Sequence, residues 1–168
     1  MNPMQGLRIQ KLVVHMGVGE SGEKLAKAEE VLSRITDQKP VKAIARKTQP
    51  AFGTRKGSPI GCKVTLRGDA AEAFFETSLS IIDRQLPASH FDSRGNFSFG
   101  IEEHTDFPGM SYDPSIGIFG MDVNVVLEKR GARISRRKVN QRKLPQKQRV
   151  EREEAMRFLQ EHYKVEVR

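Results

Sequence analysis

The pattern of apolar positions along the chain predicts short strands and helices in alternation. Residues 7–16 are rich in β-branched and apolar side chains and lie between two glycines, which is typical of a strand. A helix is expected from Ser21 or Gly22 onward. Its apolar side chains recur with the spacing of one helix face, at Leu25, Ala28, Leu32 and Ile35. Pro40 should end this helix, because the residue before a proline avoids the helical region.

Two further strands, at residues 41–45 and 61–67, are expected to flank a long loop. In the second strand, Cys62, Val64 and Leu66 alternate with Lys63, Thr65 and Arg67. Successive side chains of a strand point to opposite faces, so this strand should be buried on one face and cationic on the other. The loop between the strands contains Pro50, Gly53, Gly57 and Pro59 and has no apolar pattern of its own. Long loops of this kind are usually functional or disordered.

The rest of the chain repeats the same elements. Asp69 with Glu72 resembles a capping box, and the helix after it should run to Leu86 before Pro87. Strands are expected at residues 96–101 and 118–127, a short helix at 150–163 and a last short strand at 165–167. The order β-α-β-β-α-β-β-α predicts an α+β fold. Its sheet should be mostly antiparallel, with helices packed on one face, while the other face and the long basic loop stay free for a partner.

We expect one α+β domain over residues 1–128. Residues 129–168 should form a basic extension and a C-terminal helix packed on that domain. Residues 129–148 show no apolar periodicity, and a segment that buries so little cannot offset its ordering entropy. This segment is therefore expected to be disordered or extended until it binds a partner.

Charge is strongly segregated along the chain. Residues 42–67 hold seven Lys or Arg and no acid, and residues 129–152 hold eleven Lys or Arg and one acid, Glu151. The whole chain has 29 basic and 21 acidic residues, so the remainder has 11 and 20, a charge of −9. An acidic body with two basic segments suggests a polyanionic partner, and nucleic acid is the first hypothesis.

Composition excludes several other classes. The single cysteine, Cys62, rules out an internal disulfide and a cysteine-cluster metal site. The four histidines show no metal-ligand spacing, so we expect no metal and no cofactor. No apolar run approaches the ~20 residues of a membrane span, and the N-terminus lacks the apolar region of a signal peptide. The protein is expected to be soluble and cytoplasmic, with no membrane partner.

Residues 17–22 match the dinucleotide-binding pattern G-x-G-x-x-G after a predicted strand. However, Glu20 would place a carboxylate beside the pyrophosphate, and a hairpin follows in place of a second βα unit. A tight strand-to-helix turn is the simpler interpretation. The adjacent acids Glu102 and Glu103 should face opposite ways, so they do not suggest an acid/base pair.

The aromatic residues leave two questions open. Phe97 and Phe99 share an apolar face with Ile101, which favours a core role over a base-stacking platform. Phe52 lies in the basic loop, where packing within the loop and stacking on RNA are both consistent with the sequence.

Two long motifs then identify a resemblance. The stretch RKTQPAFGTRKGSPIGCKVTLRG (residues 46–68), preceded by MGVGES (16–21), is similar to the family of large-subunit ribosomal proteins numbered five. These are the 5S-rRNA-binding proteins of the central protuberance. The stretch FDSRGNFSFGIEEHTDFPGMSYDPSIGIFGMDV (91–123) resembles the second signature of the same family. The early first strand and the basic C-terminal extension resemble the archaeal/eukaryotic-type branch.

The resemblance implies a non-enzymatic scaffold in the cytoplasmic ribosome, with three kinds of contact. Contacts to 5S rRNA and 23S rRNA are assigned partly on charge alone, to Arg8, Lys11, His15, Lys42, Arg46, Lys63, Thr65, Arg67, Arg133, Arg136, Arg137, Lys138, Arg142 and Lys143. Contacts to P-site tRNA are implied for Lys47, Gln49, Phe52, Arg55 and Lys56. Contact with a small-subunit head ribosomal protein is implied for Arg94 and Asn96. Other central-protuberance ribosomal proteins are implied as neighbours.

Two alternatives remain open from the sequence. One is a free-standing RNA- or DNA-binding regulator. The other is a small nucleotide-dependent oxidoreductase that uses residues 17–22.

Overall fold

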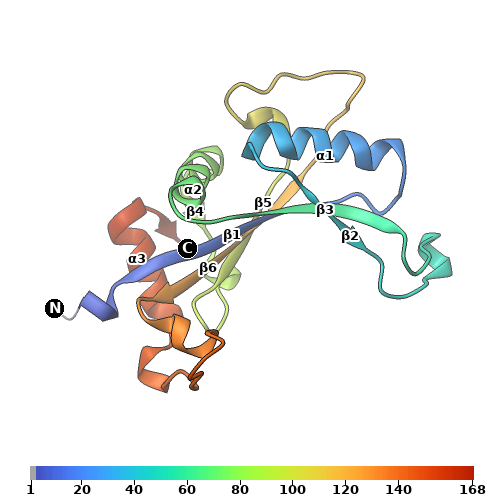
Figure 1. The fold of residues 1–168 in the computed structure, drawn as a ribbon. Helices are drawn as coiled ribbons and strands as arrows, with labels where there is room; N and C mark the ends of the chain where they lie inside the picture. The colour runs from blue at the N-terminus through green and yellow to red at the C-terminus, as the bar shows by residue number, and fades with distance from the viewer. Residues whose placement is uncertain (1–2) are drawn as a thin grey trace. The chain divides into compact units, whose positions relative to one another are not determined.

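The computed structural model of the protein describes residues 3–168, and Figure 1 shows its fold. Within these residues the α-helices are α1 (Glu23–Thr36), α2 (Asp69–Ile81) and α3 (Arg152–Tyr163). The strands are β1 (Leu7–Gly17), β2 (Val41–Ile44), β3 (Pro59–Leu66), β4 (Gln85–Leu86), β5 (Phe97–Ile101), β6 (Met121–Lys129) and β7 (Glu166–Val167).

Five of the strands form one sheet in the order β2-β3-β1-β6-β5, and β4 pairs in parallel with β7. The five-stranded sheet is antiparallel, which confirms the predicted α+β class. The chain divides into two compact units. Unit 1 comprises residues 1–12, 67–99 and 124–168, and unit 2 comprises residues 13–66 and 100–123. The predicted division at residue 128 stays a prediction.

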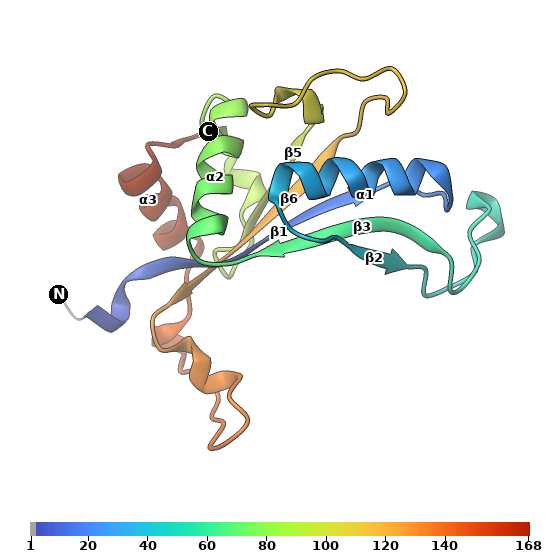
Figure 2. The same ribbon diagram turned by 45° about the horizontal axis from the view of Figure 1, so that its top comes forward.

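In unit 2, α1 packs along β3, as Figures 1 and 2 both show. Leu25, Ala28 and Leu32 of the predicted helix face are buried, as is Cys62 on β3. The helix ends at Thr36, before the predicted stop at Pro40. Asp37 takes a left-handed conformation with φ 50°, which ends helices independently of a following proline.

In unit 1, aromatic rings join α2 to its neighbours. The ring of Phe75 lies 5.7 Å from that of Phe97 on β5 and 5.0 Å from that of Tyr163 at the end of α3. Phe97 and Phe99 are only 3% and 5% exposed. The core role of both residues is therefore confirmed, and neither ring is available for stacking on a base.

The predicted capping box and the predicted C-terminal end of α2 were wrong. Gly68 occupies the N-cap position with φ 59°, and no side chain caps the helix, so Asp69 and Glu72 do not form a capping box. Both acids lie in the first turn, where the helix dipole favours negative charge. The helix ends at Ile81 because Asp83 and Arg84 adopt left-handed conformations. Leu86 consequently lies in β4.

Two expectations for the second half of the chain also need correction. β6 begins at Met121, three residues after the predicted Ile118, whose side chain is 54% exposed. Residues 129–148 were expected to be disordered or extended, but they are folded and contain two short 3-10 turns, at Ala132–Ser135 and Gln146–Gln148. Local bonds hold the segment, including Arg142 N–H to the Ile134 carbonyl at 3.2 Å. Apolar periodicity cannot detect such bonds. The predicted last strand is confirmed as β7.

Candidate nucleic-acid interface

The arm between β2 and β3 is an ordered projection of unit 2 (Figure 2). At its base, Ala45 N–H donates to the Ser58 carbonyl at 2.9 Å. Near its tip, Gln49 and Thr54 exchange two backbone hydrogen bonds, and Pro50–Phe52 forms a 3-10 turn closed by Gly53. The arm therefore has structure of its own, which the sequence did not predict.

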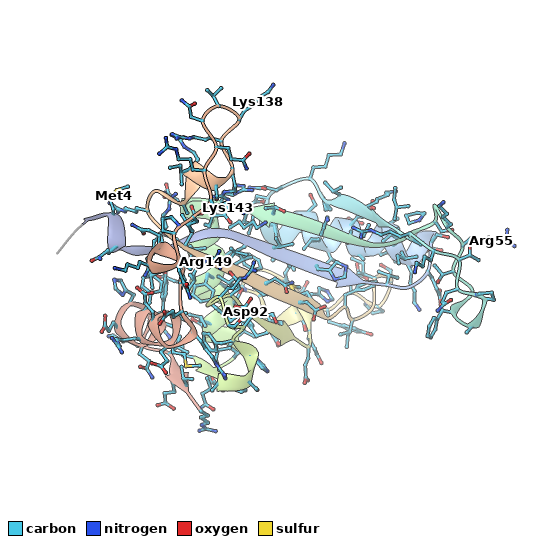
Figure 3. All side chains as sticks on the ribbon, turned by 90° about the horizontal axis from the view of Figure 1, so that it is seen from below. Met4, Arg55, Asp92, Lys138, Lys143 and Arg149 are labelled. Carbon is cyan, nitrogen blue, oxygen red and sulfur yellow. The ribbon has the colours of Figure 1, made fainter. Side chains whose placement is uncertain are left out.

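The side chains at the tip of the arm point to solvent. All five residues assigned to tRNA are exposed: Lys47, Gln49, Phe52, Arg55 and Lys56. Phe52 is 78% exposed, so it does not pack within the arm, and of its two predicted roles only stacking on a partner stays open. Figure 3 shows Arg55 at the far end of the arm. Arg46, assigned to rRNA, is also exposed near the base of the arm.

The strand β3 carries the predicted alternation. Cys62, Val64 and Leu66 are buried, whereas Lys63 and Thr65 are exposed. Arg67 follows the strand and is exposed as well. Lys63 and Thr65 thus lie side by side on the sheet face that α1 leaves open, as predicted.

Lys42 was assigned to the same face, and this placement was wrong. In the β2–β3 register Lys42 is the partner of Cys62, whose side chain is buried under α1. Paired residues in antiparallel strands share a face. The Lys42 ammonium group accordingly lies 3.5 Å from the Glu29 carboxylate of α1. Lys42 therefore belongs to the helix side of the hairpin.

His15 and Asp122 form a neighbouring polar pair in unit 2. The imidazole Nδ1 of His15 lies 3.7 Å from an Asp122 carboxylate oxygen, and His15 is half-buried. An anionic ligand at His15 would meet the carboxylate at close range, which weakens His15 as a phosphate contact.

In unit 1 a connected polar cluster lies on and around β1. The Glu128 carboxylate, on β6, accepts from Arg8 at 2.8 Å and from Arg136 at 2.5 Å. The side-chain oxygen of Gln10, in the orientation that satisfies its neighbours, accepts from Arg67 and Arg136. The cluster therefore fixes two guanidinium groups on Glu128 and a third, that of Arg67, on Gln10. Lys11, also on β1, is half-buried.

An open pocket of about 720 Å³ adjoins this cluster. Its walls come from β1, the turn before β5, β6 and residues 132–150, all within unit 1. Among the residues predicted for rRNA, it is lined by Arg136, Arg142 and Lys143. Arg94 and Asn96, predicted for the intersubunit contact, line the same pocket. Residues predicted to bind rRNA and residues predicted for the intersubunit contact therefore line one pocket.

The remaining rRNA candidates lie outside the pocket lining. Arg133, Arg137 and Lys138 are exposed on the segment between β6 and α3. Arg137 Nε donates to the Asn140 carbonyl at 2.8 Å, which shapes the tip of that segment. Figure 3 shows Lys138 at this tip, pointing away, while Lys143 and Arg149 lie beside the sheet strands.

The pocket also contains residues that the sequence did not single out. Gln10, Gln148 and Arg149 line it, and the side-chain oxygen of Gln148 is buried without a hydrogen-bond partner among the described residues. Arg149 lay within the basic segment that charge had marked. Nothing in the sequence around Gln10 or Gln148 distinguishes them from surface glutamines.

The geometry of residues 17–22 does not fit a dinucleotide site. The N–H groups of Val18 and Gly19 both donate to the Ile60 carbonyl, at 3.1 and 2.8 Å, so they cannot bind a phosphate. The sheet that precedes them is antiparallel, whereas the fingerprint requires parallel βαβ units. Residues 17–22 form the tight turn between β1 and α1.

Two other potentially reactive side chains, those of Cys62 and His104, are buried in the core. Cys62 is fully buried, and burial raises the pKa of its thiol to about 11. His104 is also buried, and its Nδ1 accepts from Phe119 N–H at 3.2 Å. Within residues 3–168, no cluster of His, Cys, Asp and Glu could hold a metal ion. None of the described helices is long and apolar enough to cross a membrane.

An α+β fold with an acid-free arm and two further cation-rich surfaces is typical of an RNA-binding protein. The sequence profile of the family described as ribosomal protein L5 matches residues 2–55, and the profile of the C-terminus of the same ribosomal family matches residues 59–163. The chain therefore belongs to the ribosomal protein L5 family.

Three relatives illustrate how close the similarity is. The large ribosomal subunit protein uL5 of Methanoculleus marisnigri is 66% identical over 167 residues, covering 99% of this chain and 100% of that protein. The uL5 protein of Methanoregula boonei is 64% identical over 165 residues, covering 98% and 100%. That of Methanospirillum hungatei is 58% identical over 167 residues, covering 99% of both. The predicted family is confirmed, and these archaeal relatives agree with the predicted archaeal/eukaryotic-type branch.

Proposed function

We propose that this protein is a structural constituent of the large ribosomal subunit that binds 5S rRNA and helps to attach it to 23S rRNA in the central protuberance. The segregation of charge carries this proposal. Two segments with 18 basic residues and one acid stand on a body with 11 basic and 20 acidic residues. Such a body would repel a polyanion except at the basic surfaces, so the charge pattern directs RNA to them.

The exposed side chains of β3 are the first of these surfaces. Lys63 and Thr65 are exposed on one strand, and Arg67 follows them. A lysine and a hydroxyl at alternate positions of a rigid strand suit successive contacts to phosphate and ribose groups. The Arg8–Glu128–Arg136 cluster of unit 1 supplies further guanidinium groups at fixed positions.

The arm between β2 and β3 suits a different RNA partner, P-site tRNA. Its backbone hydrogen bonds hold the tip in one conformation before any partner binds, which lowers the entropic cost of binding. Arg55 and Lys56 offer charge, and the exposed ring of Phe52 offers a stacking surface. Neither basic residue forms an ion pair within residues 3–168.

Protein contacts complete the proposal. The motif at residues 91–123 would face a small-subunit head protein, and other central-protuberance proteins would be neighbours. The exposed side chains of Tyr112 and Ile118 support a protein contact there, because the recognition of RNA phosphates does not need large apolar groups.

The experiment compares two double variants of the full chain in binding to cognate 5S rRNA by filter retention. Lys63→Ala with Arg67→Ala should weaken binding by about tenfold or more, because two phosphate contacts are lost. Arg55→Ala with Lys56→Ala removes the same charge and should leave 5S rRNA affinity within about twofold of the wild type, because the arm is assigned to tRNA. In reconstituted ribosomes the order should reverse, with the arm variant impairing tRNA-dependent steps.

Equal loss of 5S rRNA affinity in both variants would contradict the division between strand and arm. Absence of rRNA binding by the wild-type chain would contradict the proposed function itself. A free-standing regulator would bind RNA but would not co-sediment with large ribosomal subunits.

A further inference from the structure

The pocket of unit 1 is concave. An RNA duplex contacts a protein surface through its backbone, so a duplex would not enter such a pocket. Its volume of about 720 Å³ is in the range of sites that enclose a small ligand. The apolar part of the wall is formed by Val126, Leu127, Ala132, Leu144 and Val150. A planar, partly apolar group could therefore insert between the strands and residues 132–150.

Positive charge lines the rest of the pocket. It contains six Lys or Arg and one acid, Glu128. Arg8 and Arg136 neutralise Glu128, and Lys129 is paired with Glu154 at 2.7 Å. The other four cations form no side-chain hydrogen bond or ion pair with the described residues; they are Arg94, Arg142, Lys143 and Arg149. Their charges are free to bind a phosphate group.

Gln148 is the third feature of the pocket, after its apolar wall and its free cations, that points to a ligand. Its side-chain oxygen is buried at the pocket wall and accepts no hydrogen bond from any described residue. A buried acceptor without a donor is costly, so a turn of the Gln148 side chain that brings its oxygen to an N–H donor in the pocket would relieve that cost. A nucleobase carries amino and imino donors on its edge and apolar faces on either side, and in a nucleotide it is linked through ribose to a phosphate.

We propose that this pocket holds one unpaired nucleotide of the rRNA, with the base edge donating to Gln148 and the phosphate bound by Arg142, Lys143 and Arg149. The proposal rests on the proposed function, which makes rRNA the source of the nucleotide. Only an unstacked base from a loop or bulge can enter such a pocket. Arg94 and Asn96 line the same wall, so this inference assigns them an RNA contact in place of the intersubunit contact.

Site-directed crosslinking tests the position of the nucleotide. Lys143→Cys places a thiol at the pocket, and Lys138→Cys places one at the tip of the same segment, outside the lining. Cys62 is buried with a pKa raised to about 11, so a photoreactive alkylating reagent modifies the introduced thiol first. The modified full chains are irradiated on cognate 5S and 23S rRNA. We expect the Lys143→Cys adduct to mark a single unpaired nucleotide, and the Lys138→Cys adduct to mark other positions.

A second variant tests the contact with the base. Gln148→Met keeps the length of the side chain but removes the acceptor, and rRNA affinity should fall about three- to tenfold. The salt dependence of binding should not change, because no phosphate contact is lost. The melting temperature of the free protein should stay equal or rise, since the unsatisfied acceptor is gone. Gln146→Met is the matched control, at an exposed position outside the lining, and should alter neither property.

The outcomes separate this proposal from the proposed function. If the wild-type chain binds rRNA but Gln148→Met binds equally well, or Lys143→Cys marks no single nucleotide, the pocket proposal is overturned and the proposed function stands. Loss of melting temperature in Gln148→Met with unchanged rRNA affinity would assign the residue a packing role and overturn the proposal as well. If 5′-nucleoside monophosphates protect Lys143→Cys from alkylation and rRNA does not, the pocket is a site for free nucleotides and the proposal is overturned.

Discussion

At the scale of single residues, the carboxylate of Glu128 lies between the guanidinium groups of Arg8 and Arg136. Its side chain is only 10% exposed, so the attraction is less screened than at an open surface. Without this acid the two arginines would repel each other when RNA is absent. Glu128 therefore holds the basic cluster in place for a partner, although it carries the charge that RNA would avoid.

His104 gives a pH-dependent prediction at the same scale. Burial lowers the pKa of His104 and outweighs the backbone hydrogen bond with Phe119, which raises it, so the folded protein favours the neutral ring. The nearby Glu103 carboxylate opposes this shift in the pKa. The unfolded chain takes up a proton below about pH 6.5, while the folded chain resists it. The free energy of unfolding should therefore fall as the pH decreases through that value.

Urea denaturation at pH 7.5 and 5.5 measures this effect. His104→Asn keeps an acceptor at the position of Nδ1 but does not titrate, so its loss of stability on acidification should be smaller than that of the wild type. His90→Asn, at an exposed position, should retain the wild-type loss. An equal pH dependence in His104→Asn and the wild type would refute the assignment.

At the scale of elements, the close approach of β3 to β1 in unit 2 depends on Gly61. A Cβ atom at this position would lie 2.7 Å from the Met16 carbonyl oxygen, which belongs to the backbone and cannot rotate away. Gly61→Ala should therefore destabilise the protein by about 1–3 kcal/mol. Denaturant midpoints give the measurement.

Gly100 on β5 is the matched control for Gly61. Both glycines lie within strands, but a Cβ atom at Gly100 would meet nothing within 4 Å. Gly100→Ala should change stability by less than about 0.5 kcal/mol. If both substitutions cost the same, β-strand propensity and not the close approach would govern the position.

The elements also show where sequence patterns succeed. The alternation of Cys62, Val64 and Leu66 with Lys63 and Thr65 correctly predicted which side of β3 is buried, because a strand has only two faces. The same logic failed for Lys42, since four residues of β2 with little burial contain no alternation to follow. Only its pairing with Cys62 determines the face.

At the scale of the whole molecule, the chain has a formal charge of +8, but the basic excess lies in two segments. Electrostatic binding should consequently be steep in salt even though the body is acidic. If six to ten phosphates are contacted, affinity for 5S rRNA should fall by about 10³–10⁵ between 50 and 200 mM salt. Filter binding over this range measures the slope, and an affinity insensitive to salt would exclude the electrostatic mechanism.

The amino-acid sequence was sufficient to predict the fold class, the core faces of the main strands and helices, and the segregation of charge. These features follow from local periodicity and composition, which do not depend on which residues touch one another. The family could also be predicted, because two long motifs in the same order leave little room for coincidence. The left-handed conformations of Asp37, Asp83 and Arg84 could not be predicted, so both helices end elsewhere than expected.

Which polar residues act together became clear only from the folded chain. The pocket of unit 1 gathers Gln10, Arg94, Arg142 and Gln148 from positions far apart in the sequence. Such convergence depends on strand order and on local turns that no short pattern encodes. The buried, unpartnered oxygen of Gln148 is visible only once the surrounding walls are in place. Charge along the sequence showed where RNA could bind, whereas packing showed where a single nucleotide would fit.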